Sequence, residues 1–176
     1  MDSRLGRQIN ELAGVLNDAG ISFALIGGLA LASHNVIRAT QDIDLLVEAG
    51  DTDRINGLLL NLGYQCIHQS DDASNYLRDD ERVDLLYATR PVARQLLLSA
   101  VGHETSFGIL RVVSMEGLIG FKLQAIVNNP KRTQDIEDIR ALLRNNKNGI
   151  NMTEVRKYFQ LYDRENLLDE LLHEIS

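Results

Sequence analysis

The residues best suited to chemistry lie between Phe23 and Val47, where two glycines are followed by two aspartates. Asp42 and Asp44 stand two positions apart, directly before the apolar run 45–47. Side chains two apart on a strand point to the same side, so this spacing places both carboxylates together. Two such carboxylates repel each other unless a cation lies between them, and Mg²⁺ prefers oxygen ligands of this kind. The pair therefore predicts a divalent metal site.

The two glycines, Gly27 and Gly28, follow the apolar run 23–26 and precede helix-forming residues. Glycine in a turn from strand to helix lets backbone N–H groups approach an anion closely. We therefore expect a phosphate-binding turn ahead of the metal-binding carboxylates, an order that indicates nucleotide chemistry. The plainer alternative is a strand–turn–helix–strand unit whose two aspartates are solvated.

A third carboxylate, Asp84, lies inside the strand-like segment 82–88. Strand alternation places Val83 and Leu85 on one face and Asp84 on the other. A carboxylate within an apolar strand is costly to bury unless it is paired or metal-bound. An aspartate on an edge strand that faces water is the alternative.

Charged residues also mark the expected helices beyond residue 114. Lys122 borders the apolar face of a helix that Ser114 is expected to cap, and a surface lysine with a buried stem is the alternative. Asp135 and Asp138 stand one turn apart on the next helix, 133–144, with Thr133 as its expected N-cap. Acids in a first helical turn favour the helix dipole, which is the simplest explanation of both aspartates.

Composition narrows the class of protein. The 176 residues are 44% hydrophobic and carry a net charge of −7, which argues against broad, charge-driven nucleic-acid binding. We expect no membrane span and no signal peptide, and the single cysteine fits a reducing cytoplasm. Cys66 lies in a strand-like segment and is expected to be a buried structural thiol. The four histidines show no zinc-ligand spacing.

Hydrophobic periodicity supplies the elements that must position these residues. The predicted helices are 4–18, 29–35, 52–62, 91–100, 133–144 and 166–175, with a further helix after Ser114. The predicted strands are 23–26, the run after Asp44, 64–68, a hairpin over 74–87 and a ribbon around Gly108.

The ordered combination of Gly27-Gly28 and Asp42-x-Asp44 resembles the signature of the nucleotidyltransferase (DNA polymerase β-like) superfamily. Within it, the chain is most similar to the AbiEii-type group, which includes toxins of toxin–antitoxin systems. The resemblance covers roughly residues 5–145. It implies an α+β fold, with a mixed β-sheet flanked by helices and a helical C-terminal part. We expect a nucleotidyltransferase core at 1–113 and a helical region, packed on that core, at 114–176.

The resemblance also implies an activity, the Mg²⁺-dependent transfer of a nucleoside monophosphate from a nucleoside triphosphate to an acceptor hydroxyl. Asp42 and Asp44 would hold Mg²⁺ against the triphosphate, and Asp84 would complete a second metal site and take the hydroxyl proton. The backbone at Gly27 and Gly28 would bind the phosphates.

Further roles follow from the same resemblance. Lys122 and Arg38 would offset charge on the pyrophosphate, while Asp135 would orient Lys122 or an acceptor group. Many superfamily members carry a serine or threonine directly after the glycines, whereas this chain has Leu29 and Ala30, with Ser33 one helical turn further on. Many relatives also carry a lysine where this chain has Gln134.

Three classes of function remain open. An AbiEii-like toxin would act on an acceptor such as tRNA and would have an antitoxin protein as partner. A nucleotidyltransferase that modifies aminoglycosides or lincosamides shares the same core signature, and an acidic chain suits a cationic acceptor. The third class is a non-catalytic module that binds nucleotides or partners and has kept the fold.

Overall fold

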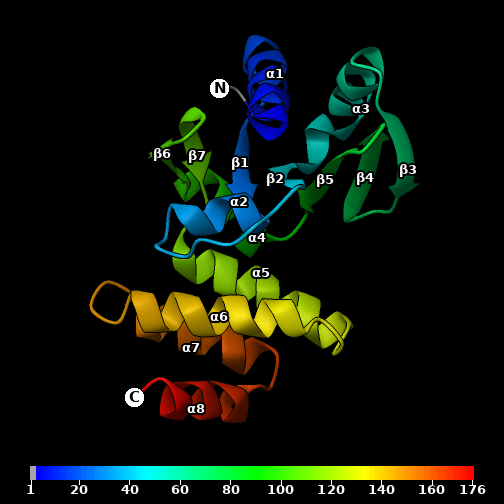
Figure 1. Ribbon diagram of the computed structural model, residues 1–176. Helices are drawn as coiled ribbons and strands as arrows, with labels where there is room; N and C mark the ends of the chain where they lie inside the picture. The colour runs from blue at the N-terminus through cyan, green and yellow to red at the C-terminus, as the bar shows by residue number, and fades with distance from the viewer. Residues whose placement is uncertain (1–2) are drawn as a thin grey trace. The chain divides into compact units, whose positions relative to one another are not determined.

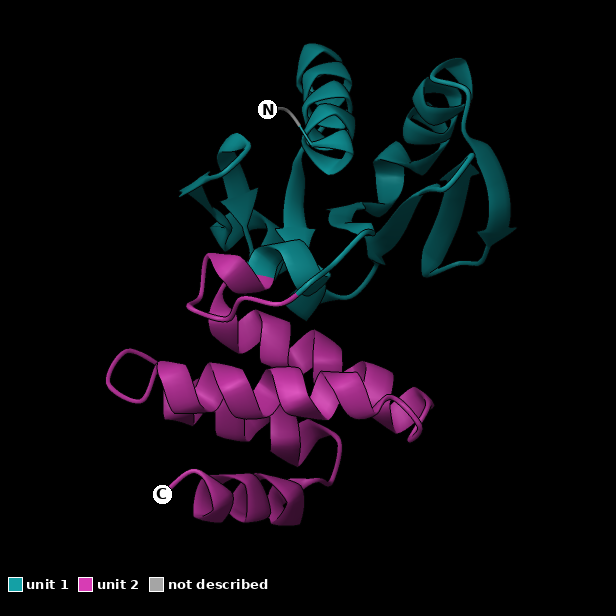
Figure 2. Cartoon of the chain, viewed as in Figure 1, with its two compact units in different colours: residues 1–30, 39–113 teal, residues 31–38, 114–176 magenta. Residues whose placement is uncertain are grey.

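The computed structural model describes residues 3–176. They form two compact units, which Figure 2 colours separately. The first comprises the chain up to Ala30 together with Ala39–Val113, and the second comprises Leu31–Arg38 together with Ser114–Ser176. The segment 31–38 falls within the expected nucleotidyltransferase core at 1–113, but in the structure it groups with the C-terminal helices.

A seven-stranded mixed sheet is the centre of the first unit. Its strand order is β3-β4-β5-β2-β1-β7-β6, which can be followed across Figure 1. Strand β2 pairs with β1 antiparallel and with β5 parallel, and β1 also pairs parallel with β7. The expected α+β class with a mixed sheet is therefore confirmed. The strands are β1 (Phe23–Ile26), β2 (Ile43–Glu48), β3 (Gln65–Gln69), β4 (Ala73–Arg78), β5 (Glu81–Ala88), β6 (Val101–Thr105) and β7 (Gly108–Val112).

Apolar residues explain why the middle strands form the core of this unit. All four residues of β1 are buried, and in β5 the buried side chains Val83 and Leu85 alternate with partly exposed ones. Such alternation buries one face of a strand and leaves Asp84 on the other. The helices that accompany the strands are α1 (Arg4–Asp18), α2 (Gly27–Ala32), α3 (Thr52–Asn61) and α4 (Pro91–Ser99), with a 3₁₀ turn at Ala49–Asp51.

The second unit is built from helices. They are α5 (Met115–Asn128), α6 (Thr133–Asn145), α7 (Met152–Leu161) and α8 (Glu165–Glu174). Ser114 caps α5 as expected, because its side chain accepts a hydrogen bond from the Gly117 N–H. Gly120 lets α5 approach α7 closely, since a Cβ there would lie 2.8 Å from the Tyr158 ring.

Several local expectations differ from the structure. The helix expected at 29–35 is α2, which begins earlier, at Gly27, and ends earlier, at Ala32. It cannot extend to Asn35, because that residue adopts a positive φ of 62° that a helix does not permit. Thr133 is the first helical residue and not the cap, a position taken by Arg132. Cys66 is exposed, because β3 is an edge strand whose residues all face solvent. The helix predicted at 166–175 begins one residue earlier, at Glu165.

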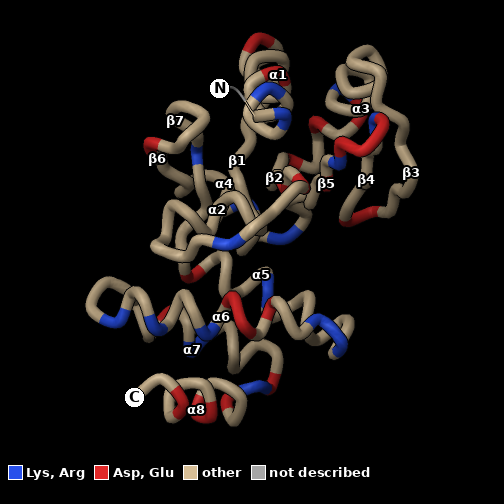
Figure 3. The backbone as a smooth tube through the Cα atoms, in the orientation of Figure 1, with Lys and Arg blue, Asp and Glu red and all other residues tan. Residues whose placement is uncertain are grey.

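Charged residues of both signs are interspersed over both units (Figure 3). Helix α6 is an example, with Asp135 in its first turn and Arg144 in its last. This arrangement complements the helix dipole. Within residues 3–176, the helices are all too short or too polar to cross a membrane.

Candidate active site

The turn between β1 and α2 forms one wall of the candidate site. Gly27 has a φ of +66°, which L side chains rarely adopt, and a Cβ there would lie 2.6 Å from Asp44 Cγ. A Cβ on Gly28 would lie 2.7 Å from Thr40 Oγ1. Both glycines are therefore required by close approach, and the first of them makes room for the Asp44 carboxylate.

Asp84 lies directly beside Asp44. The two residues are register partners on the parallel strands β2 and β5, and both are partly exposed. Register partners on neighbouring strands present their side chains to the same face of a sheet. Asp42, two residues before Asp44, is exposed and lies directly before the first residue of β2. The first unit thus brings the three predicted aspartates to neighbouring backbone positions.

Two residues that sequence reasoning missed hold the Asp84 carboxylate. Asn75 Nδ2 donates to Asp84 Oδ1 at 2.6 Å, and Arg82 Nε lies 3.0 Å from Oδ1 and 3.1 Å from Oδ2. The hydrogen bond to Asp84 raises the pKa of Arg82, and the charges of Asp42 and Asp44 add to the rise while partial burial opposes it. Arg82 is therefore a counter-charge to Asp42, Asp44 and Asp84, which together we call the aspartate cluster.

The sequence contains spacing that could have identified both Arg82 and Asn75 as partners of Asp84. Arg82 precedes Asp84 by two positions on β5, so strand alternation places the two side chains on one face. Asn75 is the register partner of Asp84 in the hairpin of β4 and β5. A hairpin register counted from the turn at 79–80 would have paired these two positions.

The donor set suits a hard divalent cation. Three carboxylates on neighbouring positions provide the oxygen ligands that Mg²⁺ prefers. Across residues 3–176, no group of three or more His, Cys, Asp or Glu side chains is already arranged to hold a metal ion. Arg82 already supplies a positive charge to Asp84. A metal ion bound by Asp84 would compete with this ion pair for the carboxylate.

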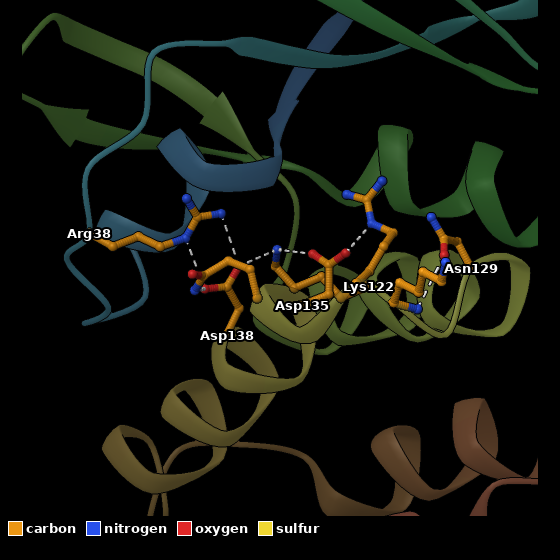
Figure 4. A network of polar contacts seen from close by, with 8 residues as sticks. Arg38, Lys122, Asn129, Asp135 and Asp138 are labelled. Carbon is orange, nitrogen blue, oxygen red and sulfur yellow. Dashed lines mark hydrogen bonds and ion pairs between the residues drawn. The ribbon is translucent and has the colours of Figure 1, made fainter.

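The second unit contains the other predicted site residues, of which Lys122, Asp135 and Arg38 are joined in one network (Figure 4). Lys122 Nζ on α5 lies 3.0 Å from Asp135 Oδ1 and 2.6 Å from Asp138 Oδ2, both on α6. Arg132 pairs with Asp135 at one end of the network, and Arg38 pairs with Asp138 at the other. The Lys122 side chain is only 7% exposed. A surface lysine with only its stem buried is therefore excluded.

Arg38 holds Asp138 with a two-pronged contact. Its Nε lies 2.9 Å from Asp138 Oδ1 and its Nη2 lies 3.0 Å from Oδ2. Burial by itself raises the pKa of Asp138, but the hydrogen bonds from Arg38 and Lys122 outweigh burial and leave that pKa below its ordinary value. Asp138 is thus an ionised, buried carboxylate between two cations.

The predicted residues therefore fall into two groups, each within one unit. The aspartate cluster and the glycine turn belong to the first unit. Lys122, Asp135 and Arg38 belong to the second, as does Ser33, which is partly exposed just beyond α2. In this second group, three cations (Arg38, Lys122 and Arg132) surround two carboxylates (Asp135 and Asp138), so the network carries one positive charge in excess.

Comparison with known proteins identifies the relatives of this arrangement. Residues 2–99, more than half of the chain, match the family described as uncharacterised nucleotidyltransferase. No curated protein sequence is significantly similar to the chain.

Three solved structures share the fold. The solution structure of the antibiotic-resistance factor ANT(2'')-Ia aligns over 100% of both chains, with a TM-score of 0.70 and 17% identity. The lincosamide antibiotic adenylyltransferase LnuA, solved with lincomycin bound, aligns over 77% of this chain and 94% of its own, with a TM-score of 0.58 and 14% identity. A putative nucleotidyltransferase from Thermotoga maritima aligns over 78% of this chain and 91% of its own, with a TM-score of 0.52 and 16% identity.

Proposed function

Since the chain belongs to the family of uncharacterised nucleotidyltransferases, we propose that it transfers a nucleoside monophosphate from a nucleoside triphosphate to a hydroxyl of a small acceptor molecule. The observation that carries this proposal is the register pairing of Asp44 with Asp84 beside the Gly27 turn. That pairing supplies adjacent carboxylates on one face of the sheet, next to a backbone turn that has no side chain to obstruct a phosphate.

The proposed reaction is an in-line displacement at the α-phosphorus. The acceptor oxygen forms a bond to that phosphorus as the bond to the bridging oxygen of the β-phosphate breaks, and pyrophosphate leaves. Asp84 takes the proton of the attacking hydroxyl, because its carboxylate is held in place by Asn75 and is partly open to solvent. Asn75 thereby orients the base.

Asp42, Asp44 and Asp84 are the residues that would hold Mg²⁺. When bound, Mg²⁺ neutralises charge on the triphosphate and stabilises the attacking and leaving oxygens. Gly27 and Gly28 would offer backbone N–H groups to the phosphates. Lys122, Asp135, Arg38 and Ser33 stay predicted contributors to nucleotide binding, with Asp135 already bonded to Lys122.

A small, cationic acceptor is the better supported class. ANT(2'')-Ia, which aligns with the full length of this chain, has also been solved in complex with adenylyl-2''-tobramycin, and LnuA with lincomycin. The net charge of −7 favours a positively charged acceptor over a polyanion. Aminoglycosides and lincosamides are therefore the first acceptors to test.

An AbiEii-type toxin that modifies tRNA and is restrained by an antitoxin is the second candidate. The observation in its favour is the ion pair of Lys122 with the two acids of the next helix, since the resemblance to that group includes a lysine followed by an acidic motif. An acceptor of this class must overcome repulsion between RNA and an acidic chain.

The test is direct detection of the labelled product. Purified protein is incubated with each α-³²P-labelled nucleoside triphosphate, with Mg²⁺ or EDTA, and with either a panel of aminoglycosides and lincosamides or total tRNA. We expect label on one small acceptor, dependent on Mg²⁺ and lost in Asp44→Asn. Label on tRNA would support the toxin, and no transfer to any acceptor in either arm would contradict the small-acceptor proposal.

A further inference from the structure

The aspartate cluster contains its own cation. Asp44 and Asp84 are neighbours on parallel strands, and Asp42 lies directly before β2, the strand that contains Asp44. Carboxylates this close repel one another unless a positive charge compensates them. Arg82 provides that charge, because it pairs with Asp84 and also interacts electrostatically with Asp42 and Asp44.

The contact between Arg82 and Asp84 is of the weaker kind. A single nitrogen, Nε, reaches both carboxylate oxygens, whereas the strongest arginine–carboxylate pairs use two nitrogens in parallel. The Arg82 side chain is 43% exposed, so water competes for the contact. Arg38, by contrast, uses two nitrogens on Asp138. The Arg82 contact can therefore open at small cost.

We propose that Arg82 is a built-in counter-ion that competes with a divalent cation for Asp84 and leaves it when metal and triphosphate bind together. The inference rests on the proposed function, because it takes the aspartates to be the metal and nucleotide site. Arg82 is a positioning residue in this scheme. Without nucleotide it keeps the three carboxylates from repelling one another, and once released it is a cation available to the anionic triphosphate.

Coupled binding follows from this competition. A metal ion that arrives alone must displace Arg82, whereas a metal–nucleotide complex brings its own phosphate oxygens as a new partner for the guanidinium. The protein should therefore bind divalent cations weakly by itself and more tightly with nucleotide. The alternative is that Arg82 is a permanent clamp that shapes Asp84 for the metal, in which case its removal weakens metal binding.

Manganese binding distinguishes the two schemes. Free Mn²⁺ is measured by electron paramagnetic resonance during titration of the wild type, Arg82→Gln and Arg82→Lys, with and without a non-hydrolysable nucleoside triphosphate. Arg54→Gln is the matched control, because Arg54 also pairs with an aspartate, Asp51, and its substitution causes the same change in net charge. We expect Arg82→Gln to bind Mn²⁺ about fivefold more tightly than the wild type when nucleotide is absent. Arg82→Lys should lie between them, and Arg54→Gln should match the wild type.

The other possible outcomes separate the role of Arg82 from the proposed metal site and from the proposed reaction. Equal or weaker Mn²⁺ binding by Arg82→Gln, in a variant whose thermal unfolding remains cooperative, overturns the inference alone. If Arg82→Gln does not fold, Mn²⁺ binding by Arg82→Lys no tighter than wild type overturns it instead. Failure of every variant to bind Mn²⁺ overturns the proposed metal site as well. A preserved difference in Mn²⁺ affinity together with no nucleotide transfer leaves the inference standing and contradicts only the proposed reaction.

Discussion

The absence of a side chain at Gly27 allows the turn between β1 and α2 to lie against the Asp44 carboxylate. The residue has a positive φ, and its missing Cβ leaves the space that the Asp44 carboxylate occupies. The glycine expected to admit a phosphate thus has a second role that only the fold reveals. It sets how closely the turn approaches the aspartate cluster.

Gly27→Ala should therefore lower both stability and activity. A left-handed backbone conformation with a Cβ costs roughly 1–3 kcal/mol, and the new methyl group would displace Asp44. Gly14→Ala is the control, because a Cβ at Gly14 on α1 meets nothing within 4 Å and should stabilise the helix by about 0.5–1 kcal/mol. Urea unfolding measures both changes. Wild-type stability and wild-type nucleotide transfer in Gly27→Ala would contradict this account.

Lys122 is the clearest case in which burial changes the interpretation of a residue. It lies between Asp135 and Asp138, and the network alternates in sign from Arg132 to Arg38. Sequence patterning placed Lys122 at the border of the buried face. The structure instead makes it the shared partner of two buried carboxylates, so its first role is to keep their charges compensated.

Lys122→Met should consequently destabilise the protein by about 1–3 kcal/mol, because each buried carboxylate loses one charged hydrogen bond while keeping its arginine partner. Lys157→Met, at an exposed position on α7, should have little effect. Urea unfolding and nucleotide transfer are measured side by side. A loss of less than about 1 kcal/mol together with a large loss of transfer would return Lys122 to a role in the chemistry.

At the scale of elements, the start of α7 joins two helices. The Asn151 side chain accepts from the Glu154 N–H, which is one of the two hydrogen bonds of a capping box. The second hydrogen bond comes from elsewhere, because the Asn151 N–H donates to Glu116 Oε1 on α5 at 2.8 Å. Glu154 is left beside Glu116, and burial followed by the charge of Glu116 raises the pKa of Glu154.

Glu154→Gln should remove a destabilising effect that grows with pH. A carboxyl group whose pKa is raised by folding stabilises the folded state fully below its unfolded pKa of about 4.3, and that stability is lost as pH rises through the folded value. The variant should therefore match the wild type near pH 4 and exceed it near pH 7, by a few tenths to about 1 kcal/mol. Glu165→Gln, on the exposed first turn of α8, is the control for thermal unfolding at both pH values. A variant less stable than wild type near pH 7 would contradict this reasoning.

Most helices and strands were predictable from the sequence, whereas the neighbours of each strand and the contacts of its side chains were less predictable. The helix over 4–18 and the hairpin over 74–87 were confirmed because periodicity and turn residues act locally. The exposure of Cys66 was missed because apolar neighbours do not reveal that β3 is an edge strand. Arg82 was not predicted because a metal-ligand pattern consists of carboxylates, although the two-residue spacing of Arg82 from Asp84 places both side chains on one face of the strand.

At the scale of the whole molecule, the chain between the glycine turn and the aspartate pair belongs to the other unit. Residues 31–38 lie with the C-terminal helices, although Gly28 before them and Asp42 after them belong to the sheet unit. Asn146 at the end of α6 secures this segment by donating to His34 O and accepting from Asn35 Nδ2, each at 2.9 Å. These partners are more than 100 residues apart, so no local pattern predicts them.

Asn146→Ala tests whether this attachment matters to the site. Its side chain is buried, so the substitution leaves the His34 carbonyl without that donor and should cost about 1–3 kcal/mol. Hydrogen exchange should accelerate over 31–38, because the segment loses two of its hydrogen bonds to α6 while the sheet keeps its own. Nucleotide transfer should fall with it, because the same segment connects Gly28 to Asp42 along the chain. Asn148→Ala, exposed in the same turn, should leave exchange and transfer unchanged. Wild-type exchange over 31–38 in Asn146→Ala would mean that other contacts hold the segment, such as the ion pair of Arg38 with Asp138 and the hydrogen bond from Asn145 to the Asn35 carbonyl.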